Sequence, residues 1–175
     1  CHQEIEKGVQ IYIVCRLLQE KEKIDLKAAT EAFAEYSQTL HPARCALLHG
    51  KMPSEQKKLI MDQFKNKEIQ VLISTVVIEV GVDIPNANIM LIEHPERFGL
   101  SQLHQLRGRI GRGGDQGWCF LMTPSGISQE AMERIRFLEK TRDGFALSQF
   151  DLENRGPGEF TGTRQHGFLD FQFLN

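Results

Sequence analysis

Three arginines lie close together between glycines in residues 105–112, which read Gln-Leu-Arg-Gly-Arg-Ile-Gly-Arg. No acidic residue occurs at positions 98–114, so nothing in the local sequence neutralises these cations. A guanidinium group stays protonated at working pH, and its planar fork matches phosphate oxygens. On a helical path Gln105, Arg109 and Arg112 would share one face, because they are spaced by four and three residues. The run predicts that Arg109 and Arg112 stabilise the charge that develops on a phosphoryl group during transfer, an effect worth roughly 10³–10⁵ in rate.

An Arg-Gly run could instead belong to a disordered RNA-binding segment, or its arginines could be ordinary surface charges. A disordered segment of this kind would be long and repetitive. Here the run is short and follows residues 100–106, in which the leucines have helical spacing, and it precedes the strand-like residues 118–122. We therefore favour an ordered helix that carries the arginines.

A second candidate segment, residues 74–85, leaves the end of the apolar run at residues 71–74 and extends to Pro85. Thr75 offers a hydroxyl group that suits a nucleic-acid phosphate. Gly81 would let a ligand approach the backbone closely, and Asp83 could accept a hydrogen bond from a ribose hydroxyl. Ligands of open α/β sheets bind at the carboxyl ends of the strands, which is where this segment begins. A plain surface turn, with Asp83 as a helix cap, would have a similar sequence.

A third polar segment, His49-Gly50-Lys51-Met52, follows the apolar residues 45–48. Glycine permits a tight turn, and Lys51 supplies a point charge for a phosphate. An ordinary loop between a strand and a helix would look similar, so this segment is informative only in combination with the other two.

The sequence lacks the motifs that a complete binding site for a nucleoside triphosphate would need. There is no Gly-x-x-x-x-Gly-Lys-Ser/Thr loop, and no acidic magnesium-binding motif follows a strand. No Gly-x-Gly-x-x-Gly opens the first strand–helix unit, which disfavours a dinucleotide-dependent enzyme. Arginines without a phosphate loop would form half an active site, which has to close against another domain that holds ATP and Mg²⁺. We expect no metal ligands within this chain.

Composition narrows the class of protein. The 175 residues carry a formal net charge of −2, so there is no global basic field, and DNA contacts must be local or shared with a partner domain. The four cysteines are far apart and form no Cys-x-x-Cys pair, which argues against a zinc site or a disulfide framework and favours a reduced, cytoplasmic setting. No apolar run approaches membrane-spanning length, so we expect no membrane partner. The chain begins with Cys1 rather than Met, and we interpret it as a fragment of a longer protein.

Short apolar runs alternate with segments of helical periodicity, which is typical of strand–helix–strand units in a parallel sheet. The apolar runs are continuous rather than alternating, which predicts an α/β fold whose strands are covered on both faces. We predict helices that begin after Asp25 and at Ser54, each with that residue as its cap, the first of them over residues 26–40. The predicted strands are residues 11–15, 45–48, 71–74, 89–92 and 118–122.

A boundary is expected near residues 123–126, which divides the chain into a domain at 1–123 and an appendage at 124–175. Residues 128–141 have apolar side chains at helical spacing, Asp143-Gly144 would break that helix, and residues 145–154 would form a second one. Two short helices about one turn make a helical hairpin. A polar, glycine-rich loop follows it, and then a tail in which Phe168, Phe171 and Phe173 are typical of an extended segment that docks on another surface.

These three clusters, in this order and at these strand ends, resemble the second RecA-like domain of superfamily-two helicases. Residues 78–87 and 96–109 look more specifically like the RecG family of ATP-dependent DNA helicases. Residues 151–159, followed by Gly-Thr-Arg-Gln at 162–165, resemble the translocation motif of that family. Bacterial transcription-repair coupling factors share the motor and the hairpin, but His-Pro-Glu-Arg-Phe-Gly at 94–99 and the Gly-Thr-Arg-Gln sequence favour RecG.

The resemblance implies a RecA-like fold and a role for each polar residue. Arg109 and Arg112 would be arginine fingers that contact the γ-phosphate of ATP. The resemblance implies nucleotide contacts for Gln105, Gly81 and Asp83, DNA-backbone contacts for Thr75, His49 and Gly50, and coupling of domain closure to movement along DNA for Arg155, Arg164 and Gln165.

The resemblance also implies a function, which is that of the C-terminal motor half of an ATPase that moves on duplex DNA and remodels stalled forks and Holliday junctions. The first motor domain, which would hold most of the ATP and Mg²⁺ contacts, and a wedge domain would lie elsewhere in a longer bacterial protein. We expect this chain alone to lack ATPase activity. The rival interpretation is a non-catalytic nucleic-acid-binding module. It predicts salt-sensitive binding by this chain alone, with a log–log slope of about −0.9 per phosphate contact.

Overall fold

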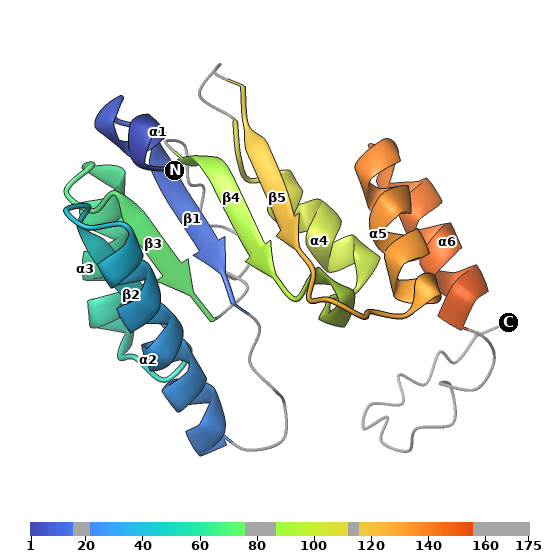
Figure 1. Ribbon diagram of the computed structural model, residues 1–175, viewed down its shortest axis with the longest axis horizontal. Coiled ribbons are helices and arrows are strands. Elements are labelled where there is room, and N and C mark those ends of the chain that lie inside the picture. The colour runs from blue at the N-terminus through green and yellow to red at the C-terminus, as the bar shows by residue number, and fades with distance from the viewer. Residues whose placement is uncertain (16–21, 76–86, 112–115, 156–175) are drawn as a thin grey trace, which may run out of the picture.

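A parallel sheet with helices on both faces, followed by a pair of helices at one end, makes up the computed structural model of the protein (Figure 1). The structure describes residues 1–15, 22–75, 87–111 and 116–155. In chain order the elements are α1 (His2–Glu6), β1 (Gln10–Val14), α2 (Glu22–Thr39), β2 (Cys45–Leu48), α3 (Ser54–Lys65), β3 (Val71–Ser74), β4 (Ala87–Glu93), the 3₁₀ turn η1 (Pro95–Arg97), α4 (Leu100–Arg107), β5 (Trp118–Met122), α5 (Gln129–Lys140) and α6 (Gly144–Arg155).

The five strands lie in the order β2-β3-β1-β4-β5, and every neighbouring pair is parallel. Ser74 at the end of β3 lies opposite both Val14 of β1 and Leu48 of β2, and Val14 also lies opposite Ile92 of β4. The strands therefore end at one common edge. This carboxyl edge is where open α/β sheets bind their ligands.

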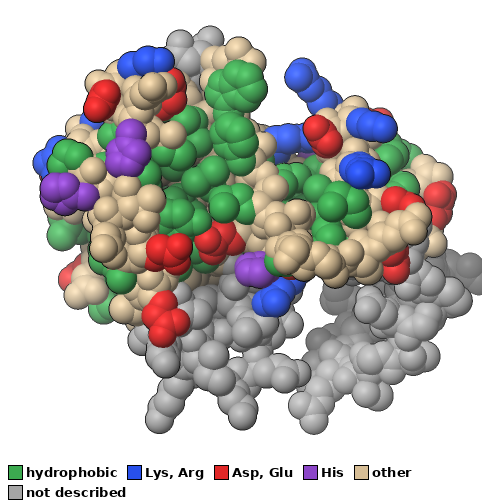
Figure 2. Space-filling model, in the orientation of Figure 1, with side chains coloured by type: hydrophobic (Ala, Val, Ile, Leu, Met, Phe, Trp, Pro, Cys, Tyr) green, Lys and Arg blue, Asp and Glu red, His purple; other side chains and the backbone are tan. Residues whose placement is uncertain are grey.

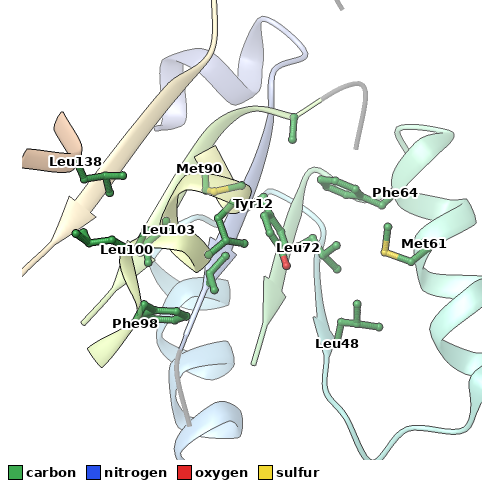
Figure 3. Packing of buried hydrophobic residues seen from close by; sticks show 14 of the residues in the cluster. Tyr12, Leu48, Met61, Phe64, Leu72, Met90, Phe98, Leu100, Leu103 and Leu138 are labelled. Atoms are coloured by element: carbon green, nitrogen blue, oxygen red, sulfur yellow. The ribbon is translucent and has the colours of Figure 1, made fainter. Parts of the chain in front are cut away.

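Side chains alternate between the two faces of each strand and divide the core into two layers. On one face Ile13 and Ile73 pack with Phe33 of α2. On the opposite face Tyr12 of β1 belongs to a cluster that draws on α3 and α4 (Figure 3). Its buried members from the sheet and these two helices include Leu48, Met61, Phe64, Leu72, Met90, Leu100 and Leu103.

The predicted α/β fold is confirmed, and three strands have the predicted bounds: residues 45–48, 71–74 and 118–122. The first and fourth strands differ from the prediction by one or two residues at their ends. The two predicted helix caps are wrong. Helix α2 begins at Glu22, so Asp25 lies inside it. The N-cap of α3 is Pro53, which has extended dihedral angles of φ −53° and ψ 144°, and Ser54 is therefore the first helical residue.

The prediction that the strands are covered on both faces is wrong for β5, which lies at the edge of the sheet. Cys119 and Leu121 pack against the core, but Trp118, Phe120 and Met122 are 53%, 49% and 45% exposed. A continuous apolar run suggests a strand that is covered on both faces, but whether an edge strand is covered depends on which helices reach it.

Among the described helices, none is both long and apolar enough to cross a membrane.

The predicted helical hairpin is confirmed as α5 and α6. Ser128 caps α5 by accepting a hydrogen bond from the Ala131 N–H at 3.2 Å, and Phe137 stacks on Phe150 with ring centroids 4.1 Å apart. Leu138 and Leu147 belong to the same buried cluster as the leucines of α4, so the hairpin shares the core of the sheet domain. The helical break falls at residues 141–143 rather than at Gly144, which is the first residue of α6.

Candidate functional site

Helix α4 presents one apolar face to the core and one polar face to solvent. Leu100, Leu103 and Leu106 are at most 3% exposed, whereas Gln105 is exposed. The first turn is closed by the Gln102 side chain, whose Oε1 accepts a hydrogen bond from the Gly99 N–H at 3.2 Å. Leucines spaced three residues apart therefore fix the rotation of α4, and that rotation directs Gln105 outward.

Arg109 lies in a turn beyond the end of α4 and is half-buried. The helix ends at Arg107, the Arg109 N–H donates to the Leu106 oxygen at 2.9 Å, and Gly111 has a φ of +71°. The prediction of one continuous helical face through Gln105 and Arg109 is therefore wrong. The chain turns because Gly111 adopts a left-handed backbone and directs its N–H to the Ala87 oxygen of β4 at 3.4 Å.

The start of β5 supports this turn from the other side. A Cβ atom placed on Gly117 would lie 3.0 Å from both the Cα and the N atoms of Gly111. A contact that short is tighter than almost all real Cβ contacts, so a side chain at position 117 would push against the backbone of Gly111. Glycine at position 117 thus allows the two backbones to approach closely beside the turn that carries Arg109.

Arg107, the first arginine of the run, has a structural role that the sequence did not reveal. Its guanidinium donates hydrogen bonds to the backbone oxygens of Leu138 at 2.5 Å and Thr141 at 2.8 Å. These carbonyls lie at the C-terminal end of α5, where helix oxygens lack partners within the helix and attract cations. Burial, more than any neighbouring charge, lowers the pKa of Arg107 from its ordinary value. Arg107 therefore joins α4 to the hairpin.

Two further side chains join α4 and the turn before it to the hairpin. The His104 Nε2 atom lies 3.1 Å from the Arg142 oxygen, so this nitrogen carries the proton, and the same ring would lie 3.0 Å from a Cβ atom on Gly144. Arg134 of α5 donates to the Phe98 oxygen at 3.1 Å and pairs with Asp151 of α6 at 3.3 Å. Polar contacts thus tie the hairpin to both ends of α4.

At the carboxyl edge, the structure brings Thr75 and His49 together, as the parallel sheet requires. The Thr75 N–H donates to the Leu48 oxygen at 3.1 Å, which places Thr75 next to the residue that follows β2. The Thr75 hydroxyl oxygen is buried and has no hydrogen-bond partner within the part of the chain that the structure describes. A buried hydroxyl without a hydrogen-bond partner is uncommon in folded proteins.

The turn after β2 is held by a lysine from the following helix. The His49 oxygen accepts a hydrogen bond from the Met52 N–H at 3.2 Å, which closes the turn. Lys57 of α3 is half-buried and donates from Nζ to the Gly50 oxygen at 2.7 Å. Lys57 therefore fixes the loop that carries His49 and Gly50.

A polar group at the same edge escaped the sequence interpretation. The Tyr36 hydroxyl of α2 donates to the Glu93 carboxylate at 2.5 Å, at the end of β4. Burial raises the pKa of both Tyr36 and the Cys15 thiol, and a hydrogen bond to Glu93 raises each further. Both effects favour the neutral thiol of Cys15 over the thiolate. The only sequence signal was an acidic residue at the end of an apolar run.

Within the described part of the chain, no three His, Cys, Asp or Glu side chains lie together as a metal site would require.

Several predicted site residues lie outside the described residues. Arg155 ends α6, and only its backbone is described. The predicted residues outside the described ranges are Gly81, Asp83, Arg112, Arg164 and Gln165.

The sequence and the structure are both similar to those of known helicases. A family described as the helicase conserved C-terminal domain matches residues 1–114. The chain is 47% identical over 171 residues to the ATP-dependent DNA helicase RecG of Thermotoga maritima, which covers 97% of this chain and 22% of that protein. It is 46% identical to RecG of Escherichia coli strain K12 over 98% of this chain and 25% of that protein.

Solved structures agree with the sequence comparisons. A structure of RecG bound to a three-way DNA junction superposes with a TM-score of 0.75 at 44% identity, over 91% of this chain and 20% of that one. The C-terminal domain of the DEAD-box protein Dbp5 shares the fold, with a TM-score of 0.56 at 17% identity over 78% of this chain and 73% of that one. This chain spans a quarter or less of the length of the RecG relatives. The chain therefore belongs to the helicase conserved C-terminal domain family, and it has the RecA-like fold and the sequence features of the RecG helicases over nearly its whole length.

Proposed function

We propose that this chain is the C-terminal motor half of an ATPase that translocates on duplex DNA and remodels branched DNA in recombination and repair. Residues 1–123 would be the second RecA-like domain, and residues 124–175 would be the hairpin and the translocation loop. The first motor domain and a wedge domain would lie elsewhere in the same bacterial, cytoplasmic protein. The related RecG bound to a three-way junction supports the choice of branched DNA as the substrate.

The main support for this proposal is that α4 carries candidate site residues on one side and contacts the hairpin on the other. Its exposed side carries Gln105, and the turn after it carries Arg109. Its other contacts, through Arg107 and His104, attach it to the hairpin that leads into the translocation loop. A displacement of Arg109 when the motor closes would therefore be passed to the hairpin by a packed helix rather than by a flexible linker.

The residues of this chain fit one side of an ATP site. Arg109 would donate to the γ-phosphate together with Arg112, and Gln105, Gly81 and Asp83 would complete the contacts on this side. The guanidinium groups supply positive charge where charge develops during phosphoryl transfer. Mg²⁺ would be held mainly by the first motor domain.

Replacing Gly117 with alanine tests whether the turn positions Arg109. The added Cβ would lie 3.0 Å from backbone atoms of Gly111, so the turn has to give by a few tenths of an ångström. A catalytic group displaced by about 1 Å can cost up to about 100-fold, and for this smaller shift we expect the DNA-stimulated ATPase rate of the full-length protein to fall by about two- to tenfold.

Gly108→Ala is the matched control, because a Cβ at position 108 makes ordinary contacts of 3.5 Å with helix oxygens and Gly108 has helical dihedral angles. This variant should retain the ATPase rate. Equal losses in the two variants would show that position 117 has no special effect on the turn.

On the DNA side, Thr75, His49 and Gly50 would contact the phosphate backbone from the carboxyl edge. Lys57→Met tests this, because it removes the hydrogen bond that fixes the Gly50 oxygen. Junction affinity should fall by about two- to tenfold, as expected for one hydrogen bond worth about 0.5–1.5 kcal/mol.

Lys58→Met removes the same charge from the neighbouring, exposed side chain and should have a smaller effect. Fluorescence anisotropy with a labelled junction at fixed salt compares the two variants. Equal losses of affinity would mean that only the charge matters and that the loop geometry does not.

Gln165→Ala tests the coupling role of the translocation loop. ATP hydrolysis should persist in the full-length variant, because Gln165 would act after the chemical step. Unwinding of a fork should fail. If a strand-displacement assay shows normal unwinding with normal ATPase activity, the coupling role of Gln165 is wrong.

A further inference from the structure

The exposed face of β5 is an apolar stripe, formed by Trp118, Phe120 and Met122. The Trp118 and Phe120 rings stack with their centroids 6.5 Å apart. The alternate residues, Cys119 and Leu121, pack into the core. A strand at a solvated sheet edge normally carries polar or charged side chains on its outer face, so three large apolar side chains in a row indicate a contact surface.

The β5 stripe continues onto the neighbouring strand. Trp118 lies opposite Ile89 and Phe120 opposite Leu91, and both partners belong to the core layer on the α2 side. In Figure 1 no described helix overlies β5 on that side, and in Figure 2 hydrophobic side chains gather there between the body of the sheet and the hairpin. The described part of the chain thus leaves this corner of the sheet without a covering layer.

A hollow of about 590 Å³ adjoins the stripe. It is lined by both stacked aromatic residues, by Val9 and Ile89, and also by Cys1 and Glu4 at the amino end of the chain. The stripe and the amino end of the chain therefore share one surface.

The geometry of the stripe suits a helix. Faces of parallel sheets are covered by helices. From position 118 to 122 the strand rises by about 13 Å, at about 3.3 Å per residue. An α-helix covers about the same length with about nine residues, at about 1.5 Å each. The fitting partner is an amphipathic helix with apolar side chains at spacings of three and four residues.

We propose that the β5 stripe is covered by an amphipathic helix of the same polypeptide, from the part that precedes Cys1 in a RecG-length protein. The matching family is described as a C-terminal domain, and the RecG relatives are at least four times as long as the matched segment, which covers at most 25% of them. Polypeptide joined to Cys1 would start at the stripe, and closing a short loop costs little entropy. The stripe is then an interface between this domain and the chain before it.

Thiol labelling of the full-length protein tests the proposal. Phe120→Cys and Met122→Cys place thiols in the stripe, and Leu59→Cys places one at a somewhat more exposed apolar position on α3 (Leu59 is 59% exposed). Maleimide labelling at each position is followed by mass spectrometry of the labelled peptide. The thiols at 120 and 122 should react at least about tenfold more slowly than the thiol at 59, because a covering helix has to open first.

Two further labelling experiments, one at low protein concentration and one with a variant that ends at Arg155, identify the covering segment. Protection that persists at low protein concentration, and in a variant that ends at Arg155, supports the proposal. Protection that disappears on dilution would assign the stripe to a second copy of the chain. Protection that disappears on truncation would assign it to residues 156–175, and equal labelling at positions 59, 120 and 122 would show that nothing covers it. Each of these last three results overturns the proposal.

Discussion

Arg109→Ala is expected to lower the DNA-stimulated ATPase rate of the full-length protein by about 10³–10⁵-fold, while binding of a DNA junction stays largely intact. The reason is geometric. Arg109 lies in a turn held by a hydrogen bond to Leu106 and by the backbone contact between Gly111 and Gly117. The backbone from which its guanidinium extends is therefore fixed, and alanine removes the charge without changing the turn.

Arg136→Ala provides the control for Arg109→Ala, because it removes an exposed arginine of α5. Its ATPase rate should match that of the unmodified protein. Initial rates of phosphate release and junction affinities are measured for both variants in the same buffer. If Arg109→Ala reduces junction binding as strongly as hydrolysis, Arg109 is a DNA ligand, and its assignment as a finger is wrong.

Arg134→Gln is expected to separate hydrolysis from unwinding. Arg134 donates to the Phe98 oxygen just before α4 and pairs with Asp151 of α6, and both partners are largely buried. Glutamine breaks this link at the end of α4 that is farther from Arg109. A coupling free energy of roughly 1–3 kcal/mol would then be lost, so unwinding should fall by roughly 5- to 150-fold. The ATPase rate should change much less.

Arg136→Gln makes the same charge change two residues away, on the exposed side of the same helix. It should leave the number of ATP molecules hydrolysed per unwound base pair unchanged, whereas Arg134→Gln should raise that number. Thermal unfolding of both variants shows how much of any loss comes from stability. Parallel losses of ATPase and unwinding in Arg134→Gln would contradict a coupling role for the hairpin contacts.

The strands could be predicted from the sequence because their signal is local. Residues 71–74 and 45–48 are short apolar runs bounded by polar residues, and buried parallel strands need little else. The hairpin could also be predicted, because Ile135 and Leu138 have helical spacing and Asp143 supplies a capping oxygen for the Phe145 N–H at 2.8 Å.

The end of α4 could not be predicted, because it depends on distant partners. Gly108 and Gly111 both permit a turn, but the turn is fixed by the Ala87 oxygen and by the approach of Gly117. The role of Arg107 was hidden for the same reason. Its acceptors lie 31 and 34 residues away, so nothing near position 107 separates a structural arginine from a catalytic one.

The exposure of β5 shows a second kind of limit. The composition of residues 118–122 favours a strand, and the structure confirms that strand. Composition does not say whether the outer face is covered within the same chain. Trp118 and Phe120 are as apolar as core residues, yet they lie on the surface of this domain.

If this chain is half of an active site, ATP hydrolysis should require the part of the protein that carries the phosphate loop. Phosphate release is measured for the 175-residue chain alone and after mixing with the complementary part of the full-length protein, each with and without forked DNA. We expect no turnover by the chain alone and DNA-stimulated turnover in the mixture, because Arg109 and Arg112 would complete a site whose phosphate loop lies in the other part. Turnover by the chain alone would show that a complete ATP site lies within these residues, and the two-part active site would then be wrong.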